Sequence, residues 1–213
     1  MKVAFSVDDL SPLYDFDCLD LLHDTLGLKF DAFIPTNHFG EAYLPQMETW
    51  TRMLHDRSSW IQVNIHGIEH RDKNGCSIEY KDLNYEEFIT SISDSINTFR
   101  LCGFKPYGIK APGWDVNHMD DYLKASKDLG LSYVCLHRPG ETLKYQDIND
   151  IKTFGYTVCV HEDFNITNDS ILHSHIHPSQ GRNGLTNELV NHILRIMMPI
   201  VDQIEPVFLK DCL

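Results

Sequence analysis

The chain has 213 residues, of which 18 are basic and 31 acidic, so its formal net charge at pH 7 is −13 with histidine neutral. This length predicts one domain covering residues 1–213, and a hydrophobic fraction of 42% excludes a disordered chain. The negative charge repels polyphosphate, which argues against a nucleic-acid partner.

Short apolar runs alternate with helical stretches along the chain. Strands are expected at residues 3–7, 30–35, 60–65, 107–110, 131–136, 156–160 and 170–176. Helices are expected at residues 85–100, 119–129 and 185–198, the first with an apolar stripe at positions 88, 92, 96 and 99. This alternation predicts a parallel α/β sheet. The length suits a distorted barrel or an open doubly wound sheet, and both place ligands at the carboxyl ends of the strands.

Targeting segments and disulfides are not expected. No apolar run approaches the roughly 18 residues of a membrane-spanning helix, and the N-terminus reaches Asp8 and Asp9 without an apolar signal region. The six cysteines show no C-x-x-C spacing, and a chain of this length does not need a disulfide framework. We therefore expect a cytoplasmic protein with reduced thiols and no membrane partner.

Polar residues gather where the predicted strands end. They are Asp8-Asp9, then residues 66–70 with His66 and His70, then residues 110–114, then His161-Glu162-Asp163, and finally His173, His175 and His177. Each group alone has an ordinary interpretation, such as a helix cap or a solvated strand face. Together, a carboxylate pair and two histidines four residues apart are typical of a mononuclear metal site. A catalytic zinc keeps an open position for water in such a site.

The order of these motifs resembles the NodB-homology polysaccharide deacetylases of carbohydrate esterase family 4. Residues 6–9 (S-V-D-D) are similar to the family's T-F-D-D motif, and residues 66–70 (H-G-I-E-H) to H-(S/T)-x-x-H. Residues 110–114 (K-A-P-G-W) resemble R-x-P-(Y/W), and residues 172–175 (L-H-S-H) resemble L-x-x-H. The resemblance implies a distorted (β/α)7 barrel.

The resemblance also implies a metal-dependent hydrolase that removes the N-acetyl group from an N-acetylated sugar or polysaccharide. Asp9, His66 and His70 would bind Zn²⁺ or another divalent metal such as Co²⁺, Ni²⁺ or Mn²⁺. Asp8 would be the general base toward a metal-bound water, and a histidine would protonate the leaving amine. The motif favours His175 as this acid, with His173 and His177 as the other candidates.

Further residues would serve the substrate and the base. A backbone N–H of Trp114 or its neighbour would stabilise the oxyanion, and Lys110 stands where the family has the arginine that orients the base. The substrate pocket would be lined by Trp114, Pro112, His177 and His161.

Three departures from the family pattern affect these roles. Lys110 offers a point charge without the planar fork of arginine, so we expect a looser hold on the base. Gly67 replaces a serine or threonine and removes a hydroxyl near the ligands. The family's fourth-motif carboxylate has no clear counterpart, and Glu162 and Asp163 are the nearest. Two alternatives follow: an enzyme with the same fold and metal that hydrolyses another non-peptide C–N bond, and a carbohydrate-binding relative with weak or no turnover.

Overall fold

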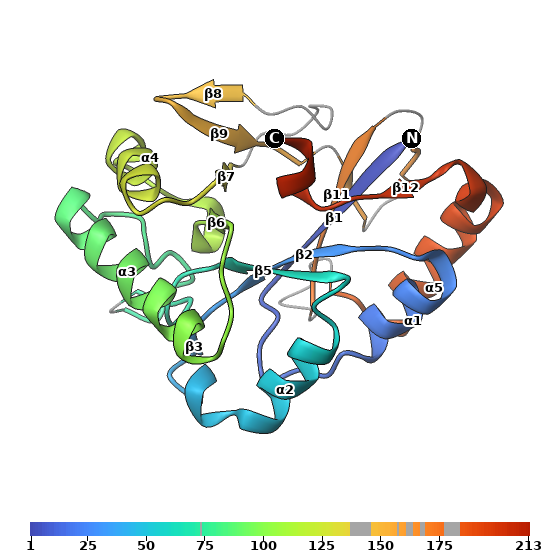
Figure 1. The fold of residues 1–213 in the computed structure, drawn as a ribbon, viewed down its shortest axis with the longest axis horizontal. Coiled ribbons are helices and arrows are strands. Elements are labelled where there is room, and N and C mark those ends of the chain that lie inside the picture. Colours follow the sequence, from blue (N-terminus) through green and yellow to red (C-terminus); the bar gives the residue numbers. More distant parts are fainter. Residues whose placement is uncertain (73, 137–145, 157, 161–163, 167–168, 177–183) are drawn as a thin grey trace.

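The centre of the molecule is one largely parallel sheet (Figure 1). The computed structural model describes residues 1–72, 74–136, 146–156, 158–160, 164–166, 169–176 and 184–213. Within these residues the strand order is β10-β11-β1-β2-β5-β6-β7-β9-β8, with β12 paired to β1. The first eight strands of this order run parallel, and only β8 is antiparallel to its neighbour β9.

All seven predicted strands are confirmed. They are β1 (Lys2–Asp8), β2 (Phe30–Ile34), β5 (Ile61–Ile65), β6 (Gly108–Lys110), β7 (Tyr133–Cys135), β10 (Val158–Cys159) and β11 (Ser170–His175). The sequence analysis missed β8 (Gln146–Ile148), β9 (Ile151–Phe154) and β12 (Glu205–Pro206). It also missed a small hairpin of β3 (Asn37–His38) and β4 (Ala42–Tyr43).

The helices lie outside the sheet, with α1 beside α5 and α3 beside α4 (Figure 1). The three predicted helices are confirmed as α3 (Tyr85–Leu101), α4 (Met119–Asp128) and α5 (Asn187–Met197). The sequence analysis missed α1 (Asp17–Leu26), α2 (Glu48–Asp56) and four short 3-10 turns (Leu44–Gln46, Pro112–Trp114, Met198–Gln203 and Leu209–Cys212). None of the helices in the described residues is long and apolar enough to cross a membrane.

Helix α3 shows how local sequence sets an element. The Asn84 side chain accepts hydrogen bonds from the amides of Glu86 and Glu87, while the Glu87 carboxylate accepts one from the Asn84 amide. This capping box satisfies amides that the first helical turn leaves without partners. The predicted apolar stripe of α3 is buried along its length, so it packs the helix onto the core.

Successive residues of β1 point into two different cores. Val3, Phe5 and Val7 belong to the large cluster between the sheet and the helices. Ala4 belongs to a smaller cluster on the opposite face, which Val207 and Leu209 of the C-terminal segment also join. This alternation follows from the two-residue period of a strand. Ser6 and Asp8 share the face of Ala4, so their polar groups point away from the helix layer.

Candidate metal centre and catalytic site

The ends of four parallel strands bring the predicted site residues to one edge of the sheet. Strand β1 ends at Asp8, β6 at Lys110 and β11 at His175, while His66 directly follows β5. The register of β1 and β11 places Asp8 beside His175. Asp8 and Asp9 do not cap α1, because that helix begins eight residues later at Asp17.

Asp9, His66 and His70 form a compact buried group. Asp9 Oδ1 lies 3.4 Å from His66 Nε2 and 3.0 Å from His70 Nε2. These separations suit donors that surround one small divalent cation at about 2.0–2.2 Å. His66 Nδ1 is 2.9 Å from the Lys110 carbonyl, and this contact orients Nε2 toward Asp9 as second-shell carbonyls do for metal-binding histidines. The three side chains therefore fit a metal ion, as one of two candidate groups of this kind in the described residues.

Backbone strain gathers around this group. Six non-glycine residues of the described chain have positive φ, and Asp9 (66°), His70 (62°) and Trp114 (61°) are among them. A non-glycine residue in this region costs about 1–3 kcal/mol, so the surrounding packing must hold these three residues in place.

Asp8 and Lys110 form an ion pair in which each side chain is 1% exposed. The Lys110 ammonium donates to Asp8 Oδ1 at 2.5 Å and to Ser6 Oγ at 2.5 Å. It also lies over the rings of Phe33 and Trp114. Lys110 is thus held from several sides, which corrects the expectation of a loose contact. Burial raises the pKa of Asp8, but the Lys110 charge and the nearby histidines outweigh it and lower this pKa to about 2.

Two histidines of β11 face Asp8. His173 Nε2 is 3.8 Å from Asp8 Oδ2, and Asp8, His173 and His175 form the second candidate group. Burial and the Lys110 charge lower the pKa of His173 well below its usual range. Burial also lowers the pKa of His175. His173 is buried, whereas His175 is partly exposed at the strand end.

In the 110–114 motif, Pro112 is buried and Trp114 partly exposed. The Trp114 ring lies 5.5 Å from that of His173. The Trp114 N–H donates to the Ala111 carbonyl at 3.1 Å, so this amide already has a backbone acceptor. His161, Glu162, Asp163 and His177 lie outside the described residues.

Sequence reasoning missed several residues around the site. Glu79, from the segment between β5 and α3, accepts hydrogen bonds from backbone amides of the 66–70 loop. Burial raises the pKa of this carboxyl, against the influence of those amides. His38 contacts Ser11 Oγ at 2.8 Å, and its ring lies 5.8 Å from that of His70. No motif marks Glu79 or His38, and only the fold brings them to the site.

A polar network lies in the sheet interior, among the residues that precede the strand ends. The Tyr133 hydroxyl is 2.9 Å from both Asp31 Oδ1 and Asn64 Oδ1, and the Leu209 amide donates to Asp31 Oδ2 at 2.9 Å. Burial raises the pKa of Asp31 to about 6, although these hydrogen bonds favour its charged form. The network ties the C-terminal segment to the centre of the sheet.

The fold is shared with solved structures of carbohydrate esterase family 4. A pseudoenzyme of this family from Bacillus anthracis matches with a TM-score of 0.62 at 11% identity, over 97% of this chain and 63% of that chain. An acetyl xylan esterase from Clostridium thermocellum in complex with a cobalt ion matches with a TM-score of 0.62 at 12% identity, over 100% and 90%. A peptidoglycan N-acetylglucosamine deacetylase matches with a TM-score of 0.62 at 13% identity, over 99% and 87%.

These matches confirm the expected distorted barrel, here a curled half-barrel. No family model matches the sequence, and no curated protein sequence matches it. The chain spans less than two thirds of the pseudoenzyme's length.

Proposed function

We propose that residues 1–213 form one domain of carbohydrate esterase family 4 that removes the N-acetyl group from an N-acetylated sugar or polysaccharide with the help of a divalent metal. One observation carries the proposal. A buried group of Asp9, His66 and His70, suited to a metal, lies next to a second buried carboxylate, Asp8, which Lys110 keeps charged. A protein that only bound a metal would need the first group but not the second. Fold relatives named as carbohydrate esterases and deacetylases support the same reaction class.

Asp9, His66 and His70 would hold the metal, and Zn²⁺ suits this donor set of one carboxylate and two imidazoles. Co²⁺, Ni²⁺ and Mn²⁺ are alternatives that the same donors accept. When bound, the metal would lower the pKa of a water and polarise the amide carbonyl.

Asp8 would act as the general base. Its low pKa keeps the carboxylate deprotonated at neutral pH, which is the form that a general base requires. Lys110, whose ammonium also donates to Ser6, fixes Oδ1 of Asp8, which leaves Oδ2 facing His66 and His173. Lys110 is therefore a positioning residue for the base.

His175 is the better candidate for the acid that protonates the leaving amine. It ends β11 beside Asp8 and is partly exposed, so a substrate can reach it, whereas His173 lies deeper in the sheet. Trp114 and Pro112 would wall the sugar pocket, together with His161 and His177 from outside the described residues. An amide near Trp114, in Gly113 or Asp115, would stabilise the oxyanion.

Acetate release from a panel of N-acetylated sugars and oligosaccharides, with and without added zinc, tests the proposal. Asp8→Asn should keep metal binding and abolish acetate release, while His66→Ala should lose the metal. His118→Ala is the matched control, since His118 is an exposed histidine at the start of α4 without a side-chain capping bond. Loss of metal in Asp8→Asn would mean that the two aspartates have exchanged roles. A wild type that releases no acetate with zinc or with any of the three alternative ions would contradict the proposal.

A second candidate is a relative that binds carbohydrate but turns it over weakly. The lowered pKa values of His173 and His175 favour it, because burial disfavours the protonated form that a general acid requires. Acetate release that stays below detection from pH 5 to pH 9, with zinc bound, would favour this candidate over the first.

A further inference from the structure

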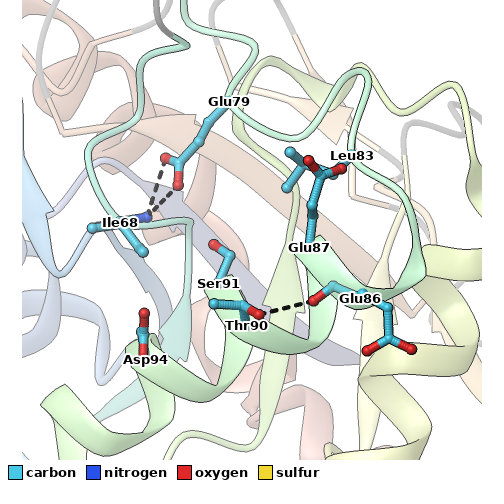
Figure 2. A pocket seen from close by; sticks show the side chains of 8 residues that line it. All are labelled: Ile68, Glu79, Leu83, Glu86, Glu87, Thr90, Ser91 and Asp94. Carbon is cyan, nitrogen blue, oxygen red and sulfur yellow. Dashed lines mark hydrogen bonds between the residues drawn. The ribbon is translucent and has the colours of Figure 1, made fainter.

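A single carboxylate holds the loop that carries two of the candidate metal ligands. Glu79 Oε2 accepts hydrogen bonds from three consecutive backbone amides, those of Ile68 at 3.1 Å, Glu69 at 3.1 Å and His70 at 2.8 Å. Glu79 Oε1 accepts a second bond from the Ile68 amide at 2.9 Å. Figure 2 shows the Glu79 carboxylate turned toward the Ile68 amide, beside a cavity of about 410 Å³ over the start of α3. A charged acceptor makes stronger hydrogen bonds than a neutral one, so Glu79 fixes the path of the 66–70 loop.

The carboxylate is itself held by a rigid anchor. Tyr80, the next residue, is fully buried, and its ring packs against those of Phe88 in α3 and Tyr122 in α4. One residue further along the chain, the Lys81 carbonyl accepts a hydrogen bond from the Asn117 amide at 2.8 Å. The segment that carries Glu79 is therefore attached to α3, to α4 and to the chain just before α4.

Two glycines in the motifs make room for this segment. At Gly67, whose φ is +76°, a Cβ would lie 2.5 Å from Glu79 Oε2 and 2.8 Å from the Pro112 side chain. At Gly113, whose φ is +62°, a Cβ would lie 2.2 Å from the Ser77 carbonyl oxygen. Residues 77–79 thus pack against both the 66–70 loop and the 110–114 loop. The glycine at position 67, which the sequence analysis treats as the loss of a hydroxyl, accommodates a carboxylate from another segment.

We propose that Glu79 is a positioning residue for the metal centre, which holds the 66–70 loop so that His66 and His70 can both reach Asp9. The role in metal binding rests on the proposed function. The geometry gives the reason: the Glu79 bonds end at the amide of His70 itself, a residue with strained positive φ whose Nε2 lies 3.0 Å from Asp9. Without the carboxylate, that amide and its two neighbours lose their common acceptor, and the strained loop is free to relax.

Hydrogen exchange of backbone amides tests the loop-holding role without any metal. In the full chain treated with a chelator, Glu79→Gln should speed exchange at Ile68, Glu69 and His70 by about 10-fold or more, the loss expected for bonds to a charged group. Glu86→Gln is the matched control, because Glu86 is an exposed carboxylate that lines the same cavity. If Glu79→Gln exchanges at these three amides within two-fold of wild type, the proposal is wrong.

Zinc affinity, measured by competition with a chromophoric chelator, tests the link to the metal. Glu79→Gln should weaken it by about 10- to 100-fold, as loss of an outer-shell partner does, while Glu86→Gln stays within two-fold of wild type. The visible spectrum of the cobalt-loaded variant should also change. A variant with faster exchange at the loop but unaltered zinc affinity and cobalt spectrum would overturn the proposal, because Glu79 would then be structural only.

A double-mutant cycle tests the contact between Gly67 and Glu79 independently. Gly67→Ala should weaken zinc binding more in the presence of Glu79 than in a Glu79→Ala background, because the added Cβ meets the carboxylate. Additive effects would contradict the proposal. If the wild type itself binds no zinc, the proposed metal-dependent function fails, and amide exchange still decides whether Glu79 holds the loop.

Discussion

Replacing Lys110 by methionine should leave Asp8 as a buried carboxylate without its ammonium partner. The methionine keeps most of the side-chain volume, so the change removes mainly the charge and the two short hydrogen bonds to Asp8 and Ser6. The wild-type environment lowers the pKa of Asp8 from 3.8 to about 2, which corresponds to roughly 2–3 kcal/mol in favour of the charged form. Without Lys110, burial disfavours the charged form of Asp8 with little compensation. The loss in the free energy of unfolding should therefore approach the roughly 3–5 kcal/mol seen when one partner of a buried pair is removed.

The pKa of Asp8 determines how the stability deficit of Lys110→Met changes with pH. In the wild type the folded pKa of Asp8 lies below the unfolded value, so its contribution is present above pH 3.8 and is lost as the pH falls through about 2. In Lys110→Met, burial should raise the folded pKa above the unfolded value, and the variant should lose stability as the pH rises. The deficit relative to wild type should therefore grow from pH 4 to pH 7. Lys110 also lowers the pKa of His173, so this pKa should rise in Lys110→Met. Protonation of His173 then stabilises the variant at acidic pH, which also makes the deficit smaller at pH 4 than at pH 7.

Urea unfolding of the metal-free protein at several pH values measures this deficit, and Lys110→Arg is the control that keeps the charge. The pH profile of acetate release should reflect the higher pKa of Asp8 in Lys110→Met. Activity should begin to fall at a higher pH than in the wild type, because a protonated Asp8 cannot act as base. Unfolding free energies of Lys110→Met and wild type that agree within about 1 kcal/mol at pH 7 would refute the reasoning.

Other predictions concern the interior network, the acid and the metal. The folded pKa of Asp31, about 6, exceeds the ordinary aspartate value of 3.8, so its contribution to stability is present below pH 3.8 and is lost as the pH rises through 6. The stability of Asp31→Asn relative to wild type should therefore increase by about 3 kcal/mol between pH 4 and pH 8, and a flat difference in urea unfolding would contradict this. His175→Ala should lower acetate release by about 10²-fold or more and stability little, while His173→Ala should do the reverse, and a larger kinetic loss in His173→Ala would reassign the acid. Chelator treatment should lower the thermal midpoint of the wild type but not of His66→Ala, and equal shifts in the two proteins would argue against His66 as a ligand.

The sequence predicts most of the sheet because the central strands are apolar runs that end abruptly in polar residues. Strand β8 is mostly exposed and β3 has two residues, so neither carries a periodic signal. The hairpin formed by β8 and β9 was therefore missed. Helix α1 is different, since Leu19, Leu22 and Leu26 form a buried stripe at helical spacing, which is a signal that the sequence does carry.

The ligand candidates were predictable because they lie in short motifs at strand ends, where a parallel sheet brings them together. Glu79 was not, because it lies nine residues beyond His70 and its function depends on backbone amides, which have no sequence signature. The contacts that hold the Lys110 ammonium were also unpredictable, since Ser6 and Phe33 contact it from two other strands. Local patterns therefore predict which residues gather, whereas the contacts that orient them depend on the assembled sheet.

The central position of β1 has a consequence for the order of folding during synthesis. Its two main neighbours are β2, which follows it closely in the chain, and β11, which ends at residue 175. Until β11 has left the ribosome, one edge of β1 offers unpaired amides and carbonyls, which is a hazard for nascent chains. The three candidate ligands are translated within the first 70 residues, yet β1, which Asp9 directly follows, is flanked on both sides only after residue 175 has been translated. The ligands are therefore made long before the strand that completes the surroundings of β1.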